Sequence, residues 1–117
     1  IITADASSLK EKHLKGAGIN SIPLAIAGME NEEEFHRALR GNKTTMDVDK
    51  MEREVVSVAR RLISQNSDIG AIVLECANMP PYAYAVRKAT GLPVFDILSL
   101  AEMMYHALFK KEFKKEI

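Results

Sequence analysis

The residues best suited to chemistry lie in the stretch 74–82, which reads LECANMPPY and contains the only cysteine of the chain, Cys76. An apolar run precedes the thiol and a proline-started helix is expected to follow it, which predicts a cysteine at the carboxyl end of a strand. Open α/β sheets bind ligands at such strand ends. Backbone N–H groups at a helix start stabilise a thiolate or a bound carboxylate. The position therefore indicates an acid/base or a nucleophile.

Polar side chains also follow two other expected strands. Thr3, Ser7 and Ser8 come after the first apolar run, and Asp96 comes after the last one. If the strands are parallel, these ends share one edge of the sheet with Cys76 and Asn78, and their side chains can face a common cleft. The simpler alternative is that Ser7, Ser8 and Asn78 only cap helices, since Ser8 stands three residues before Glu11 as in a capping box.

Cys76 and the histidines have plain alternatives as well. A lone cysteine is often a small buried apolar residue rather than a catalyst. His13, His36 and His106 have no metal-ligand spacing to one another or to Cys76, which predicts no metal site. The glycines at 16 and 18 end a helix instead of opening one, so they do not form a dinucleotide-binding loop.

The apolar periodicity alternates short runs with longer amphipathic segments, which is typical of βαβ units. Strands are expected over residues 1–3, 23–29, 69–76 and 93–97, and helices over 9–15, 31–41, 49–65, 80–90 and from 99 onward. In the helix over 49–65 one stripe is apolar: Met51, Val55, Val58, Ala59 and Leu62. The pattern predicts an α/β protein with a parallel sheet.

Composition bounds the class of protein. The 117 residues suffice for one domain, and 16 basic residues balance 16 acidic ones without clustering, so we expect no nucleic-acid partner. The apolar runs are too short to cross a membrane, so no membrane association is expected either. One cysteine fits a reducing compartment, and we expect a cytoplasmic protein. The chain begins in an apparent strand, which suggests a piece of something longer.

Two segments carry a resemblance to a known family. Residues 71–82 (AIVLECANMPPY) with 83–97 (AYAVRKATGLPVFDI) resemble the carboxyl-terminal lobe of the aspartate/glutamate racemase family, and residues 2–9 (ITADASSL) look like the start of that lobe. The resemblance spans essentially the whole chain. It implies a flavodoxin-like or Rossmann-like three-layer lobe with a mainly parallel four-stranded sheet. Residues 1–92 would form the lobe, and residues 93–117 would be a strand and helix that return to a missing amino-terminal lobe.

The same resemblance implies the chemistry of the site. The family is cofactor-independent and holds a small carboxylate between two lobes, each contributing a cysteine. Cys76 would be one catalytic acid/base, and Thr3, Ser7, Ser8 and Asn78 would contact the substrate carboxylate. The implied function is racemisation or isomerisation, by moving a proton at the carbon next to that carboxylate, and an isolated fragment would be inactive.

Two departures keep alternatives open. Many family members have Gly-Cys-Thr where this chain has Glu75-Cys76-Ala77, so a hydroxyl that would hold an amino-acid substrate is missing. Relatives in the same superfamily use one cysteine to decarboxylate an acid or to isomerise an unsaturated diacid. A further alternative is a non-catalytic lobe that binds a small anion. For each of the enzyme alternatives, the expected partners are a small carboxylate, the missing lobe and a second copy in a homo-oligomer.

Overall fold

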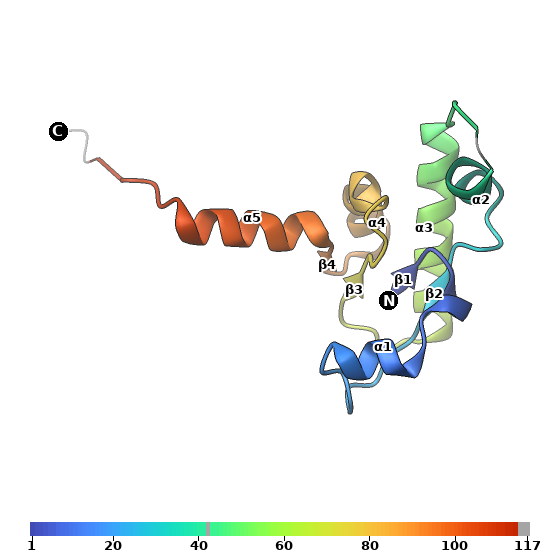
Figure 1. Cartoon of the computed structure of the whole chain (residues 1–117), viewed down its shortest axis with the longest axis horizontal. Coiled ribbons are helices and arrows are strands. Elements are labelled where there is room, and N and C mark those ends of the chain that lie inside the picture. Colours follow the sequence, from blue (N-terminus) through green and yellow to red (C-terminus); the bar gives the residue numbers. More distant parts are fainter. Residues whose placement is uncertain (42, 115–117) are drawn as a thin grey trace.

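The computed structural model describes residues 1–41 and 43–114 and shows a small body of short strands and helices from which one helix projects (Figure 1). About half of the chain is helical. The elements in order are β1 (Ile2–Thr3), η1 (Ala6–Ser8), α1 (Glu11–Gly16), β2 (Ala27–Gly28), α2 (Glu33–Arg40), α3 (Val48–Gln65), β3 (Ile72–Val73), η2 (Pro80–Tyr82), α4 (Ala83–Thr90), β4 (Val94–Phe95) and α5 (Ile97–Leu108).

The strands form two short sheets, each of two parallel strands. β1 pairs with β2, and β3 pairs with β4. A single bridge between Ile2 and Leu74 links the two pairs, with the Glu75 N–H donating to the Ile2 carbonyl at 2.8 Å. The expected flavodoxin-like or Rossmann-like three-layer lobe with a four-stranded sheet is therefore wrong. Pairing lasts for only two residues in each strand, although the apolar runs that predicted the strands are longer.

The hydrophobic core forms between the strands and helix α3. The predicted stripe of α3 is confirmed, because all five of its apolar residues are buried. α3 packs against α4, α2 and β2. The other buried apolar residues are Ile2, Met29, Phe35, Ile72, Leu74, Met79, Tyr82 and Val86. The core thus fixes the end of β1 and the segment after β3 against the same helix layer.

Two carboxylates connect α2 to α3. Glu54 of α3 accepts the backbone N–H groups of Glu34 and Phe35 at 2.8 and 2.9 Å, and so satisfies donors that the first turn of α2 leaves unpaired. Glu34 is itself buried and accepts from Arg37 and from the Asp47 N–H at 2.9 Å. The hydrogen bonds from Arg37, followed by that from Asp47, hold the pKa of Glu34 below its ordinary value. α2 is thereby fixed at its amino end.

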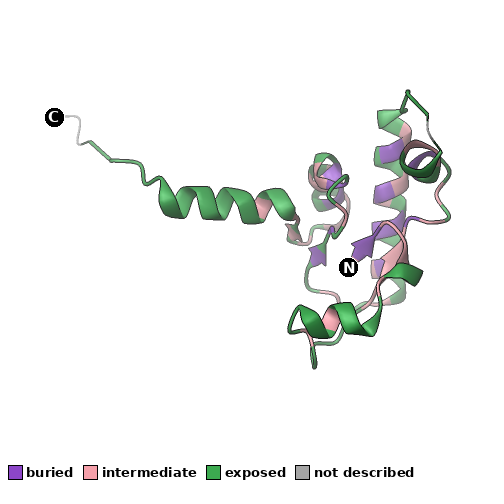
Figure 2. Ribbon diagram, viewed as in Figure 1, coloured by how far each residue is buried: buried purple, intermediate pink, exposed green. Residues whose placement is uncertain are grey.

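Over residues 1–41 and 43–114, one side of the strands carries no helix layer. Val73 of β3 and Phe95 of β4 are exposed, and Figure 2 shows that α5 is exposed along almost its whole length. A three-layer arrangement needs helices on both faces of the sheet, and the described residues cover only one. The division into residues 1–92 and 93–117 stays a prediction, and residues 115–117 of the second segment lie outside the described residues.

Local details differ from the expectations in one further place. α1 begins at Glu11 with Lys10 as its cap, whereas Ser8 belongs to the preceding turn η1 and does not cap α1. The helical stretch over 80–90 is confirmed, with its first turn as η2 and its end at Gly91, whose φ of 71° favours glycine. Among the helices of the described residues, none is long and apolar enough to cross a membrane.

Candidate active site

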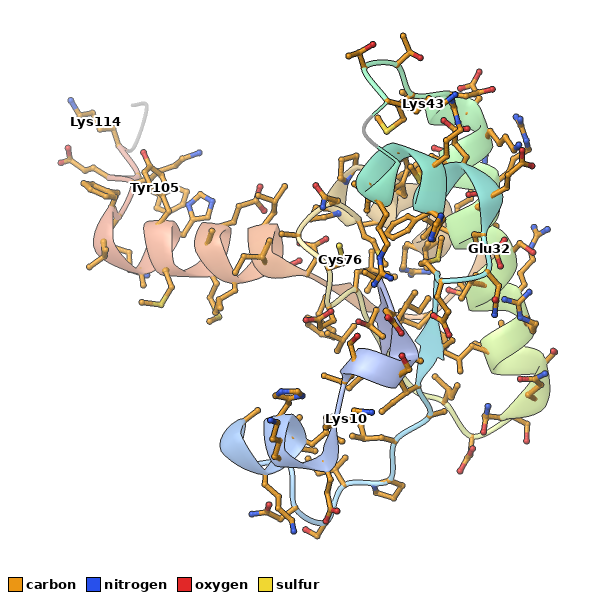
Figure 3. The ribbon with its side chains drawn as sticks, turned by 45° about the vertical axis from the view of Figure 1, so that its right-hand side comes forward. Lys10, Glu32, Lys43, Cys76, Tyr105 and Lys114 are labelled. Atoms are coloured by element: carbon orange, nitrogen blue, oxygen red, sulfur yellow. The ribbon has the colours of Figure 1, made fainter. Side chains whose placement is uncertain are left out.

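Cys76 lies just after β3, in the turn that leads to α4 (Figure 3). The Met79 N–H donates to the Cys76 carbonyl at 3.0 Å, and the fully buried Met79 side chain anchors the turn in the core. The Asn78 amide nitrogen lies 3.7 Å from Cys76 Sγ, within hydrogen-bond reach of a sulfur acceptor. The thiol is free and half-buried. The structure therefore brings the predicted pair Cys76 and Asn78 together.

Thr3 reaches the same strand end from β1. Its side chain is buried, and its hydroxyl donates to Glu75 Oε2 at 2.7 Å. The backbone bond from Glu75 to Ile2 brings the two strands to this position. Thr3 thus holds the carboxylate of the residue that immediately precedes Cys76, a contact that the spacing in the sequence did not predict.

Ser7 and Ser8 are turned toward Asp5. Both hydroxyls donate to the Asp5 carboxylate, at 2.6 and 3.0 Å, and so does the Ser7 N–H at 2.9 Å. Arg40 of α2 completes the cluster with an ion pair of 3.0 Å. The hydrogen bonds from Ser7, Ser8 and Arg40 hold the pKa of Asp5 well below its usual range. In this arrangement the two serines fix the turn η1, and their hydroxyl protons are engaged.

An open pocket of about 440 Å³ lies where these groups meet. Of the predicted site residues, Thr3 and Ser8 line this pocket, and Ser7 does not. Cys76 and Asn78 are also outside the lining, but they follow the lining residue Glu75 in the chain. The full lining is Thr3, Ala4, Asp5, Ser8, Leu9, His13, Arg40 and Glu75.

The lining residues that were not predicted as site residues include Glu75, His13 and Arg40. Glu75 carried a signal, since it adjoins the cysteine and departs from the family pattern. Arg40 carried none, because it lies 35 positions from Asp5 in the sequence and is brought there only by the packing of α2. Among residues 1–41 and 43–114, no cluster of three or more His, Cys, Asp or Glu is arranged to hold a metal ion.

Comparisons with known proteins give one consistent group of relatives. The chain is 32% identical over 107 residues to a dimethylsulfoniopropionate lyase of Durusdinium sp. clade D, a match that covers 87% of this chain and 35% of that protein. Dimethylsulfoniopropionate lyases 7 and 3 of Emiliania huxleyi are also 32% identical, over 117 residues, covering 92% of this chain and 34% and 30% of those proteins. No family model matches, and no solved structure matches. The chain spans about a third of the length of these curated relatives.

These relatives correct the expected family and activity. The aspartate/glutamate racemase family was predicted from the segments around Cys76, but the curated relatives that match most of the chain are named as lyases of a sulfonium acid. The predicted racemase or isomerase function is therefore wrong, and the decarboxylase and diacid-isomerase alternatives do not fit either. The local motif thus led to the wrong reaction, and Cys76 with its neighbours stays a prediction as the site.

Proposed function

We propose that this chain is part of a lyase that cleaves dimethylsulfoniopropionate, with Cys76 as the base. The observation that carries the proposal is the placement of Cys76 and Asn78 at a strand end, directly after a residue that lines an open pocket. The similarity to curated lyases over about nine tenths of the chain supports the choice of substrate.

The chemistry requires one proton transfer. Dimethylsulfoniopropionate carries its sulfonium one carbon away from the carbon next to the carboxylate. A thiolate at Cys76 takes a proton from the carbon next to the carboxylate, and the electron pair of that C–H bond forms the new C=C bond. The C–S bond breaks, and its electron pair leaves with sulfur as neutral dimethyl sulfide. Acrylate and the protonated thiol remain, so no oxidant, reductant or metal is needed to balance the step.

This reaction requires only one base. Inverting a carbon centre needs a base on one face and an acid on the other, whereas an elimination needs only a base when its leaving group departs as a neutral molecule. The chain has a single cysteine. In this proposal the second, opposing thiol implied by a racemase is not required.

The carboxylate of the substrate needs N–H or O–H donors near the thiol. Asn78 already contacts Cys76 through its amide nitrogen and has a second N–H to give. Arg40 uses one of its five N–H groups on Asp5 and lines the pocket. Ser7 and Ser8 remain candidates for carboxylate contacts, and each would turn its hydroxyl away from Asp5 on binding. Thr3 remains a candidate site residue that acts through Glu75, to which its hydroxyl donates.

The quaternary arrangement belongs to the proposal as well. Because the relatives are about three times as long, we propose that the chain acts as one lobe of a larger enzyme and that the segment from 93 onward packs against the rest. We further propose a homo-oligomeric, cofactor-free, cytoplasmic enzyme, without a nucleic-acid or membrane partner. The chain alone would bind substrate without turning it over.

Protection of Cys76 from alkylation tests the proposal on the chain itself. Because Cys76 is the only cysteine, the rate of modification by iodoacetamide reports on this site alone. Dimethylsulfoniopropionate should slow modification in a saturable way. Asn78→Ala should weaken the protection, whereas His36→Ala, on an exposed position of α2, should not. Alkylation that proceeds at the same rate at every concentration of the compound would overturn the proposal.

A further inference from the structure

We propose that Glu75 recognises the sulfonium cation of the substrate and so determines specificity for a positively charged acid. The inference rests on the proposed function, because it assigns the second end of the same substrate. Glu75 stands where many members of the racemase family have glycine, and the sequence motif assigned no role to it.

The charges around the pocket leave one carboxylate uncompensated. Asp5 is paired with Arg40 at 3.0 Å and accepts from two serine hydroxyls as well. Glu75 accepts a hydrogen bond from the neutral hydroxyl of Thr3. In the described part of the chain it takes part in none of the ion pairs.

The other titratable group on the pocket wall does not compensate Glu75. His13 Nδ1 accepts the backbone N–H of Lys10 at 2.9 Å, and in the described part of the chain His13 takes part in none of the ion pairs. The pocket therefore presents one uncompensated negative charge, which favours a cation over a neutral group of the same shape.

Thr3 gives the carboxylate a fixed position. The Thr3 side chain is buried in the end of β1, and its 2.7 Å hydrogen bond holds one oxygen of Glu75, leaving the other oxygen available. A carboxylate held in advance loses less conformational freedom on binding than a mobile one. Thr3 is accordingly a positioning residue, and Glu75 is the residue that contacts the ligand.

Glu75 is the immediate chain neighbour of the proposed base. The sulfonium and the carbon that loses the proton are separated by one carbon, so the groups that serve them must be close neighbours. Glu75 and Cys76 are consecutive, with their Cα atoms about 3.8 Å apart. The inference places the cation at Glu75, the residue next to the one whose thiol removes the proton.

A pair of probes of nearly equal shape tests the inference. The branching atom is a positively charged sulfur in dimethylsulfoniopropionate and a neutral C–H carbon in 4-methylpentanoate. The ratio of their dissociation constants therefore measures the effect of the positive charge on binding. Protection of Cys76 from iodoacetamide measures both constants on the 117-residue chain. The unmodified chain should bind the cation about fivefold more tightly than the neutral acid, the upper range for a pair open to solvent.

Glu75→Gln should reduce that ratio to about one while leaving 4-methylpentanoate binding unchanged. Glu102→Gln, an exposed glutamate on α5, is the matched control and should keep the ratio. Thr3→Val should give an intermediate ratio, and it supplies a second variant if Glu75→Gln unfolds the chain, which circular dichroism detects.

The outcomes separate this inference from the proposed function. An unchanged ratio in Glu75→Gln, with both compounds still protecting Cys76, overturns the role of Glu75 and leaves the lyase proposal standing. If Glu75→Gln lowers the stability of the chain but leaves the ratio of dissociation constants unchanged, the role of Glu75 in recognition is likewise overturned. That result is expected if the hydrogen bond from Thr3 to Glu75 is purely structural. Protection by neither compound in the unmodified chain overturns the lyase proposal itself.

Discussion

Helix α5 should make the isolated chain self-associate. Eight large apolar residues between 97 and 109 are each between 51% and 74% exposed: Ile97, Leu98, Leu100, Met103, Met104, Tyr105, Leu108 and Phe109. They surround the helix instead of forming one narrow stripe, and a helix that is apolar all round is normally buried. At roughly 90 Å² each they expose on the order of 700 Å² per chain, more than the few hundred Å² of a typical monomer patch.

That area is close to what a stable interface needs. A standard interface buries about 800 Å² per partner, and 700 Å² of apolar surface corresponds to roughly 17 kcal/mol per chain before the costs of association are subtracted. We therefore expect the chain to dimerise at micromolar concentration, as sedimentation velocity would show. Met104→Glu with Leu108→Glu places two charges one helical turn apart and should give a monomer, whereas Glu102→Lys should not. A wild-type chain that stays monomeric at 100 µM would show that the exposed side chains of α5 do not drive association.

Three further predictions concern stability. The pKa values of Asp5 and Glu34 are lowered on folding, so their stabilisation is complete above the ordinary pKa values of 3.8 and 4.5 and is lost as the pH falls through the lower folded values. The unfolding temperature should therefore drop as the pH is lowered from about 4.5 to about 2, and it should drop less in Asp5→Asn. Gly28→Ala should cost about 1–3 kcal/mol in chemical unfolding, because its Cβ would lie 2.5 Å from the Ala6 nitrogen; Gly70→Ala, which meets open space, should cost less. Glu54→Ala should lower the free energy of unfolding by about 1–2 kcal/mol, because it leaves two N–H groups of α2 uncapped. If the variant and the wild-type chain have the same denaturation midpoint, Glu54 does not stabilise α2.

The helices could be predicted from the sequence because their determinants are local. The stripe of α3 repeats with the helical period, and its buried residues follow directly from that pattern. The stop at Gly91 likewise depends on one residue in a left-handed conformation. Such signals lie within a few positions of one another and survive in any tertiary context.

The strands and the sheet could not be predicted in the same way. The apolar run over residues 69–76 suggested a long strand, but only Ile72 and Val73 pair with β4. The length of a strand depends on partners elsewhere in the chain, and a run of apolar residues does not specify them. For the same reason the expected four-stranded sheet is replaced by two pairs that meet at one bridge.

The same distinction between local and long-range contacts applies to the candidate site. The pair Cys76 and Asn78 is local, and the structure places them together. The contacts of Thr3 with Glu75 and of Asp5 with Arg40 join positions 72 and 35 residues apart, which a single sequence does not reveal. Ser8 illustrates a local competition, because Asp5 accepts its hydroxyl and leaves Lys10 at the cap of α1.

In the proposed enzyme, Cys76 is the base that cleaves dimethylsulfoniopropionate. The most direct measurement uses a chimaera in which this chain replaces the matching 107 residues of the Durusdinium lyase, with dimethyl sulfide measured by gas chromatography. We predict that the chimaera releases dimethyl sulfide and that Cys76→Ala lowers the rate at least about a hundredfold, as expected for loss of a general base. Release at an undiminished rate from a folded Cys76→Ala chimaera would show that Cys76 is not the base.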